Sequence, residues 1–191
     1  PIPLGFYLVA LHWGEELIAV MPFSVVIEDG GEFLEAQAYV DWSRFLLEID
    51  NPVKAVYAAT KALELDATLT QAYINRAEAY TTSCEMDNVI ADLSKALGLE
   101  PGNAALHARR GTSHWVALEP VTALIDLNKA IKLEPENAGY YNNRSLIQIA
   151  NGRLDAALSD VNKAFKLRPE SLNTLDSRGY IFLKSGQYRN A

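Results

Sequence analysis

A short phrase recurs at a fixed interval along this chain. "KALEL", "KALGL", "KAIKL" and "KAFKL" begin at Lys61, Lys95, Lys129 and Lys163, each copy thirty-four residues after the one before. A constant period between about 20 and 50 residues is typical of stacked repeats, in which neighbouring units bury one another's apolar faces. The period therefore predicts an array of small repeated units.

Other positions repeat with the same period and predict two helices in each unit. Pro101, Pro135 and Pro169 follow three of the phrases, and a proline there ends the preceding helix. Apolar residues before the phrase recur at helical spacing, as at Val89 and Leu93. We expect glycine turns between the helices at "ANGRL" and "KSGQY". Small residues are expected where helix backbones approach, at Ala77, Gly111, Ser145 and Gly179 in the first helices and at Ala62, Ala96, Ala130 and Ala164 in the second.

These columns resemble the tetratricopeptide repeat (TPR) family. The family pattern has an aromatic, a small and an aromatic residue in the first helix, then two alanines around a bulky residue and a proline. One unit matches with Tyr141, Ser145, Ala157, Val161, Ala164 and Pro169. The resemblance implies an all-α fold, a right-handed α-solenoid of antiparallel helix pairs. It covers 36–191, with units at about 36–69, 70–103, 104–137 and 138–171 and an incomplete one at 172–191.

Residues 1–35 do not fit the repeat register and form an acidic leader. Two apolar runs, "GFYLVALHW" and "LIAVMPFSVVIE", are separated by "GEE", which is compatible with a β-hairpin or with a helix up to Val20 followed by an extended piece. Seven acidic residues precede the first basic residue, Arg44, and account for the whole net charge of −7. A role as a cap of the first unit stays open.

Charge and composition exclude several classes of function. The repeated part is close to neutral, whereas nucleic-acid binding normally needs a basic stripe. No apolar run reaches the roughly 18–20 residues of a membrane span, and no targeting signal is visible. The single cysteine, Cys84, fits a reducing compartment. We therefore expect a cytoplasmic protein that binds neither nucleic acid nor membrane.

One pair of columns is not required by the family pattern, because an arginine precedes an aspartate by sixteen residues in three units. The pairs are Arg76 with Asp92, Arg110 with Asp126, and Arg144 with Asp160. We predict structural, partly buried ion pairs, within a unit or across a junction between units. An arginine ladder that faces a ligand is the alternative. Arg178 has no aspartate at the corresponding distance within the sequence.

The resemblance implies a binding face for a partner protein or an extended peptide, lined by the first helices. The side chains expected to bind peptide are Asn75, Glu78, Arg109, Thr112, Trp115, Asn142, Asn143, Leu146 and Tyr180. Amides can bond a peptide backbone in both directions, and aromatic or apolar residues accept apolar side chains. Trp115 could equally belong to the core. The family's clamp for acidic peptide ends is matched only at Asn75 and Arg109, and its asparagine ladder only at Asn75 and Asn143.

Catalytic residues, metal ligands and cofactors are not expected. His107 and His114 share a helical face, but these columns hold Tyr73, Tyr141, Tyr80 and Phe182 in other units, which favours core packing over metal binding. The sequence has no phosphate loop, cysteine cluster or nucleophile elbow. It predicts a non-enzymatic interaction scaffold. The alternative is a regulatory or targeting segment of a larger enzyme whose catalytic domain lies outside this chain.

The last repeat breaks off where its second helix should begin, and such an end leaves an apolar flank uncovered. We expect that the natural protein continues or that this end mediates self-association with another copy.

Overall fold

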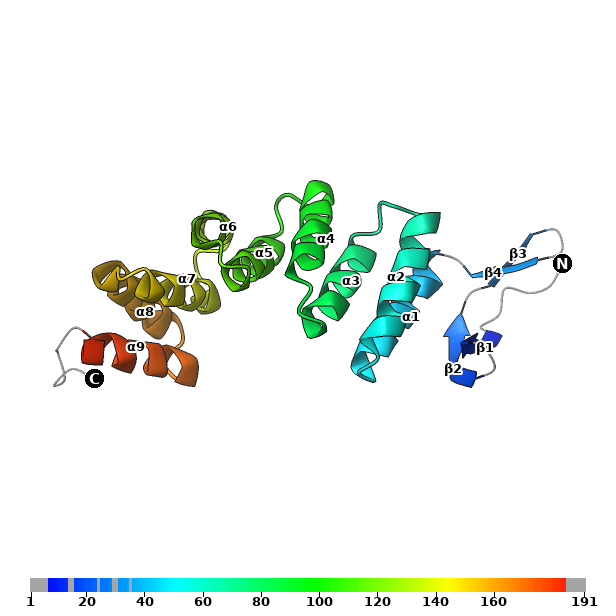
Figure 1. Ribbon diagram of the computed structural model, residues 1–191, viewed down its shortest axis with the longest axis horizontal. Coiled ribbons are helices and arrows are strands. Elements are labelled where there is room, and N and C mark those ends of the chain that lie inside the picture. Colours follow the sequence, from blue (N-terminus) through cyan, green and yellow to red (C-terminus); the bar gives the residue numbers. More distant parts are fainter. Residues whose placement is uncertain (1–6, 14–15, 24, 29–30, 35, 185–191) are drawn as a thin grey trace. The chain divides into compact units, whose positions relative to one another are not determined.

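The computed structural model describes residues 7–13, 16–23, 25–28, 31–34 and 36–184 (Figure 1). The chain divides into two compact units, Pro1–Glu85 and Met86–Ala191. Within the described helical part, first helices begin at Ala36, Thr70, Ala104, Ala138 and Leu172, and second helices at Pro52, Met86, Pro120 and Leu154. Both series have a constant interval of thirty-four residues. The expectation of two helices in each period is confirmed.

The described residues between 7 and 34 form two antiparallel strand pairs in the first unit. β1 (Tyr7–Trp13) pairs with β2 (Glu16–Phe23), and β3 (Val25–Glu28) pairs with β4 (Gly31–Leu34). The sequence was compatible with either a β-hairpin or a helix followed by an extended piece in this stretch, and the described residues form strands. A role of the leader as a cap of the first repeat stays a prediction.

The helices of the first unit are α1 (Ala36–Glu48), α2 (Pro52–Leu65) and α3 (Thr70–Thr82). α1 packs on α2, and both contact α3. Trp42 and Leu46 of α1 are buried against Ala55 and Ala58 of α2. The alanines let the two helix backbones approach while the larger side chains fill the remaining space.

The second unit contains α4 (Met86–Leu99), α5 (Ala104–Val116), α6 (Pro120–Leu133), α7 (Ala138–Ala150), α8 (Leu154–Leu167) and α9 (Leu172–Lys184). Each helix packs against the next, and α7 also contacts α9. Asparagine caps start two of them, since the side chains of Asn103 and Asn137 accept hydrogen bonds from the backbone N–H groups of Leu106 and Gly139.

The turns from first to second helices share a residue in the left-handed region. Asp50, Cys84, Leu118 and Gly152 occupy the same repeat position and have φ values of 56°, 57°, 62° and 72°. Gly152 confirms the predicted glycine turn in "ANGRL". The three non-glycine residues at this position adopt a backbone conformation that costs about 1–2 kcal/mol for a residue with a side chain. The turn expected in "KSGQY" includes residues outside the described part of the chain.

The small-residue column of the first helices marks where helices touch. Ala77, Gly111 and Ser145 are buried, as predicted. A Cβ atom on Gly111 would lie 3.0 Å from the carbonyl oxygen of Ala123 in α6, so only glycine fits without a shift. Gly179 is different, because no described atom lies within 4 Å of the Cβ it would carry.

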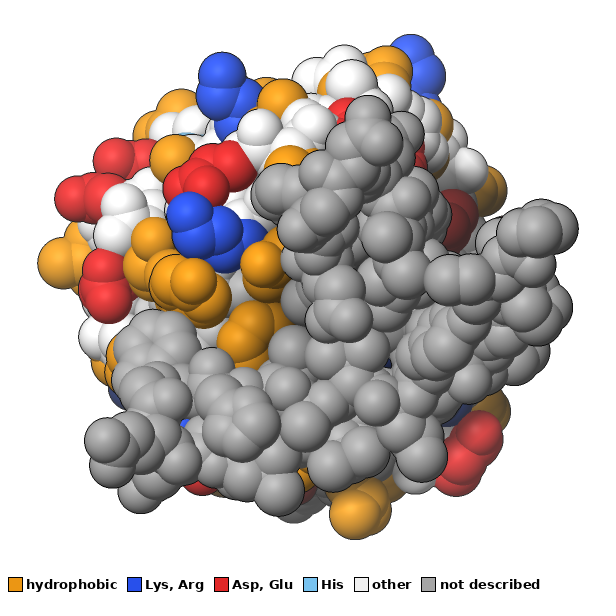
Figure 2. Space-filling model, turned by 90° about the vertical axis from the view of Figure 1, so that its right-hand side faces the viewer, with side chains coloured by type: hydrophobic (Ala, Val, Ile, Leu, Met, Phe, Trp, Pro, Cys, Tyr) orange, Lys and Arg blue, Asp and Glu red, His pale blue; other side chains and the backbone are white. Residues whose placement is uncertain are grey.

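Charged side chains of both signs are present on the surface. Figure 2 shows one face of the molecule, and acidic and basic groups lie interspersed over its described part. Among the described residues, no helix is long and apolar enough to cross a membrane.

Candidate functional site

A groove of about 760 Å³ lies on the second unit, between α7, the start of α8, and α9. Figure 1 shows these helices in yellow to red. The groove is lined by Leu146, Ile149, Ala150, Gly152, Leu154, Asp176, Ser177, Tyr180 and Lys184. Two of the predicted binding residues, Leu146 and Tyr180, are therefore brought together in one groove.

The two sides of this groove differ in chemistry. α7 and the start of α8 contribute an apolar wall that includes Leu146, Ile149 and Leu154. α9 contributes Asp176, Tyr180 and Lys184, which follow one another at helical spacing of four residues and so form a row along one face. The ammonium group of Lys184 lies 5.6 Å from the centre of the Tyr180 ring. The row has a carboxylate at one end, an aromatic ring in the middle and an ammonium group at the other end.

Exposure supports a binding role for the two apolar members. Leu146 is 45% exposed and Tyr180 is 47% exposed, although each lies on a helix that also has a buried face. Removing such side chains from water against a partner would favour binding, because burial of apolar surface is favourable. The groove thus presents solvent-exposed apolar side chains beside a charged row.

The remaining predicted residues of the second unit do not line this groove. Thr112 is exposed on α5, but its hydroxyl donates to the carbonyl oxygen of Ala108. Trp115 is partly buried against the apolar cluster around Leu127, so the structure uses at least part of it as core. Arg109 lies partly buried on α5.

The asparagines of α7 are both less exposed than Leu146 and Tyr180. Asn142 is buried, and its Oδ1 atom has no hydrogen-bond partner among the described residues. Asn143 is half-buried. A role of either amide in binding a peptide backbone stays a prediction.

In the first unit, Asn75 is used internally. Its side-chain amide donates to the carbonyl oxygen of Val40 at 3.1 Å and to the hydroxyl of Ser43 at 2.7 Å, while its oxygen accepts from Gln71. A buried amide with these bonds would have to break them to reach a peptide. The Asn75 amide is thus committed to contacts inside the first unit. Glu78 is exposed on α3.

The predicted arginine–aspartate pairs form within the repeats of the second unit. Arg110 donates from Nε and Nη2 to the Asp126 carboxylate at 2.7 and 2.8 Å. Arg144 does the same to Asp160, at 2.7 and 2.6 Å. Both aspartates are buried and both arginines are mostly buried, so these are two-pronged internal ion pairs.

Each arginine also reaches the second helix of the preceding repeat, a contact that the sequence reasoning missed. Arg110 Nη1 donates to the hydroxyl of Ser94 at 3.1 Å, and Arg144 Nη1 donates to the side-chain oxygen of Asn128 at 2.6 Å. In the first unit, Arg76 Nη1 donates to Thr60. A polar residue sixteen positions before each arginine was the available signal. Arg76 and Asp92 lie in different units, and their pairing stays a prediction.

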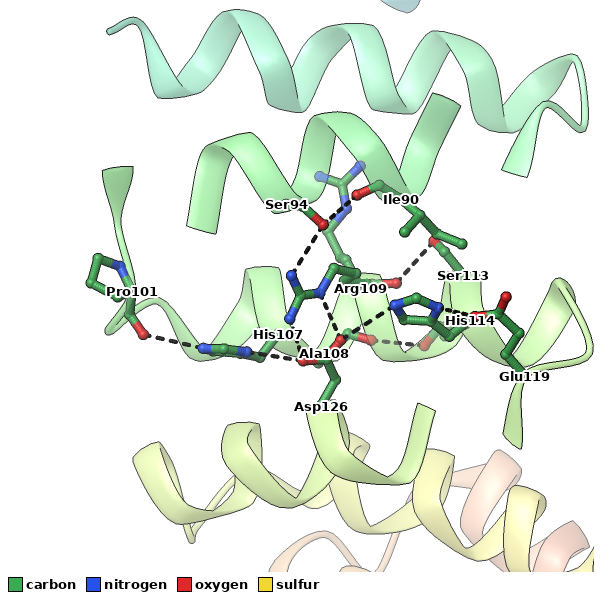
Figure 3. Close-up of polar contacts among 12 residues, drawn as sticks. Ile90, Ser94, Pro101, His107, Ala108, Arg109, Ser113, His114, Glu119 and Asp126 are labelled. Carbon is green, nitrogen blue, oxygen red and sulfur yellow. Dashed lines mark hydrogen bonds and ion pairs between the residues drawn. The ribbon is translucent and has the colours of Figure 1, made fainter. Parts of the chain in front are cut away.

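Two histidines converge on Asp126 (Figure 3). His107 Nδ1 lies 3.2 Å from Asp126 Oδ1, and its Nε2 lies 3.1 Å from the carbonyl oxygen of Pro101. His114 Nδ1 lies 2.7 Å from a carboxylate oxygen of Glu119, and its Nε2 lies 3.9 Å from Asp126. The histidines are mostly buried, as core packing predicts, but they make polar contacts that the sequence analysis did not expect.

The electrostatics of this cluster follow from its contacts. Burial raises the pKa of Asp126, but hydrogen bonds from Arg110 and His107 outweigh it, so the pKa lies below the ordinary value of 3.8. The hydrogen bond to Asp126 raises the pKa of Arg110, and the bond to Asp160 raises that of Arg144. The described residues contain no group of three or more His, Cys, Asp or Glu side chains that could hold a metal ion. The cluster is structural in its geometry, since it joins helices to one another.

Comparison with known proteins identifies the repeat. Residues 138–171, which contain α7 and α8, match the family model described as tetratricopeptide repeat. Residues 138–171 are thus a tetratricopeptide repeat by sequence. No curated protein matches the chain by sequence.

Solved TPR structures share the fold of the array at low sequence identity. A MamA segment from Desulfovibrio magneticus RS-1 superposes with a TM-score of 0.75 at 18% identity, covering 81% of this chain and 87% of that one. YrrB, whose structure is described as a TPR protein with an unusual peptide-binding site, gives 0.68 at 22% identity and covers 81% and 79%. The first TPR of Spaghetti (RPAP3), bound to an HSP90 peptide, gives 0.59 at 19% identity and covers 63% and 96%. These structures confirm the all-α TPR solenoid fold of the array.

Proposed function

We propose that this TPR array is a non-enzymatic scaffold that binds an extended peptide segment of a partner protein in the groove between α7 and α9. The observation that carries the proposal is the pair of half-exposed side chains, Leu146 and Tyr180, facing a groove of about 760 Å³. Binding sites of this size commonly combine apolar walls with a few polar groups, as this groove does.

The row on α9 suggests how such a peptide would lie. Asp176 and Lys184 are eight residues apart, which corresponds to about 12 Å along a helix. An extended chain covers that length with about four residues. The matching segment has a basic residue near Asp176, an apolar side chain against Tyr180 and Leu146, and an acidic residue near Lys184.

Two comparisons support a peptide as the ligand class. YrrB is described as having a peptide-binding site, and the first TPR of Spaghetti was solved with the peptide SRMEEVD. The acidic-end clamp of the family is matched here only at Asn75 and Arg109, and Asn75 is buried. The proposal therefore rests on the α7–α9 groove and does not invoke that clamp.

A library of displayed linear peptides, selected on the purified protein, tests the proposal. The selected peptides should carry an apolar residue flanked by opposite charges. Tyr180→Ala should weaken their binding by about tenfold or more, because truncating a central aromatic anchor commonly costs this much. Val121→Ala is the matched control, since Val121 is an exposed apolar residue of the same unit outside the groove. Equal binding by wild type and Tyr180→Ala would contradict the proposal.

The charged ends of the groove give a second readout. Exchanging Asp176 and Lys184, as Asp176→Lys with Lys184→Asp, should reverse the order of charges preferred in the selected peptides. An unchanged preference would show that the row on α9 does not orient the ligand.

A further inference from the structure

The groove between α7 and α9 has a counterpart one repeat earlier, around α5 and α7. α5 contacts α7 as α7 contacts α9, and all three helices belong to the second unit. Because the helices recur every thirty-four residues, each residue that lines the groove has an equivalent thirty-four positions before it. The equivalents of Ile149, Ala150, Gly152, Asp176 and Tyr180, here named the α5–α7 site, are Trp115, Val116, Leu118, Asn142 and Leu146.

Leu118 is the residue of the α5–α7 site that the fold explains least. It lies in the turn between α5 and α6 with a φ of 62°, in the left-handed region that disfavours residues with a side chain. Its side chain is 84% exposed, so burial of apolar surface does not offset this strain. Gly152 occupies the same turn position in the next repeat without a side chain. A strained residue that the fold does not need indicates a role in binding.

Further apolar surface belongs to the same site. Val116, the last residue of α5, is 57% exposed, and the neighbouring Trp115 is only partly buried. Leu146 on α7 belongs to both sites, because it also lines the groove between α7 and α9. The α5–α7 site is therefore continuous with that groove through Leu146.

The two sites differ in charge along their matching helix rows. The row on α9 has a carboxylate at Asp176 and an ammonium group at Lys184. The matching row on α7 is uncharged and consists of Asn142, Leu146 and Ala150. A ligand in the α5–α7 site therefore meets apolar groups and an amide where a ligand in the groove meets two charges.

Asn142 supplies a polar group that the fold leaves unused. Its Oδ1 atom is buried and has no hydrogen-bond partner among the described residues, which is uncommon for a buried acceptor. The Asn75 amide is held by three hydrogen bonds, whereas rotation of the Asn142 amide breaks no described bond of Oδ1. This oxygen can accept a hydrogen bond from a backbone N–H group of a ligand.

We propose that the α5–α7 site binds a second, uncharged apolar stretch of the same partner segment that occupies the groove between α7 and α9. This inference rests on the proposed function and specifies the ligand further. Neighbouring helices pack about 10 Å apart, so an extended chain passes from Tyr180 on α9 to Leu118 beyond α5 in about six residues. The partner segment thus carries one apolar residue flanked by opposite charges and, about six residues away, a second apolar residue without neighbouring charges.

Displayed linear peptides of twelve residues, selected separately on wild type and on Leu118→Gly, test the inference. Peptides selected on wild type should share both apolar positions. Peptides selected on Leu118→Gly should keep the charge-flanked apolar residue and lose the preference for the second one. Because Gly152 occupies this position in the next repeat, Leu118→Gly should keep the fold, as circular dichroism can verify.

Fluorescence anisotropy with one labelled peptide selected on wild type then measures the coupling. Replacing its second apolar residue by alanine should weaken binding to wild type about fivefold, and the two peptides should bind Leu118→Gly equally. Val121→Ala is the control, because Val121 is exposed on α6 outside both sites, and it should distinguish the two peptides as wild type does.

The outcomes separate this inference from the proposed function. If binding depends on Tyr180 but wild type shows no preference for a second apolar residue, the inference is overturned and the proposed function stands. A second preference that persists on Leu118→Gly also overturns the inference. Equal binding by wild type and Tyr180→Ala contradicts the groove itself, and the inference with it.

Discussion

The repeats at 104–137 and 138–171 build the same ion pair with different helpers. In both, an arginine of the first helix donates twice to an aspartate of the second and once to the preceding repeat. Around Asp126 stand His107 and His114, whereas the corresponding positions of the next repeat hold Tyr141 and Gln148.

The substituted residues partly conserve their contacts. The Tyr141 hydroxyl donates to the Pro135 carbonyl oxygen at 3.1 Å, and His107 Nε2 lies at the same distance from the equivalent carbonyl of Pro101. Only the histidine adds a contact to the aspartate, because its second nitrogen faces the carboxylate. The arginine–aspartate pair is therefore the shared part of the joint, that is, of the polar contact that links the two helices of a repeat. The residues around the pair can differ in chemistry between repeats of one molecule.

The largest expected effect comes from removing the aspartates. Asp126→Ala should lower the free energy of unfolding by about 3 kcal/mol, because it leaves Arg110 and His107 facing a space without an acceptor. Asp160→Ala should cost about 2 kcal/mol, since Arg144 alone loses its partner. Urea denaturation followed by circular dichroism measures both values.

Asp155→Ala is the control for these substitutions, because Asp155 is an exposed aspartate in the first turn of α8. We expect it to cost about 0.5 kcal/mol or less. If Asp126→Ala and Asp160→Ala were no more costly than this control, the pairs would contribute little to the joints between helices.

The next largest expected effect is a difference in stability change between alanine substitutions at two glycines that share a repeat position, Gly111 and Gly179. Gly111→Ala should lower the free energy of unfolding by about 1–2 kcal/mol, because overpacking against the Ala123 carbonyl exceeds the gain in helix propensity. Gly179→Ala should instead raise it by about 0.5–1 kcal/mol, because the propensity gain meets no described obstacle. Thermal and urea unfolding of the two variants should therefore shift in opposite directions, and a loss of stability in both would show that Gly179 also lies in close contact.

A smaller effect on the free energy of unfolding is expected at the turns between the first and second helices of these two repeats. Leu118 has φ of 62° and is 84% exposed, so Leu118→Gly should relieve strain without losing buried surface. We expect a gain of about 0.5 kcal/mol. Gly152→Leu places the same side chain in the next turn, at φ of 72°, and should cost about 1 kcal/mol. Opposite signs would support the backbone explanation, whereas a loss on Leu118→Gly would mean that the leucine side chain has a stabilising contact.

The sequence predicts the fold well because each feature that specifies a repeat occurs in several repeats. Helix ends, small residues and the arginine–aspartate spacing recur in register, so a single chance match could not imitate them. Asp126 and Asp160 show this, since their pairing was predicted from spacing alone and is present in the structure.

The candidate site was less predictable because its walls come from different elements. Leu146 and Tyr180 were expected on a binding face, but Leu154 and Lys184 were not, as they belong to a helix start and a helix end. Asn75 shows the opposite difficulty. Its amide is consumed by Val40 and Ser43, which lie more than thirty residues away and belong to another first helix. Repeat columns place a residue on a helix face, but they do not tell which neighbour uses its polar atoms.

The smallest effect, on the acid side of the stability profile, can sharpen the comparison between the two joints. The pKa of Asp126 lies below 3.8 in the folded protein, so its contacts stabilise the fold above that value and are lost as pH falls through the folded-state pKa. Wild type should thus lose stability in this window more steeply than Asp126→Asn, which has no proton to bind there. Asp155→Asn removes an exposed carboxylate and should follow wild type in the urea midpoint measured at each pH. Parallel profiles for wild type and Asp126→Asn would mean that the hydrogen bonds from Arg110 and His107 do not favour the charged carboxylate over the neutral one.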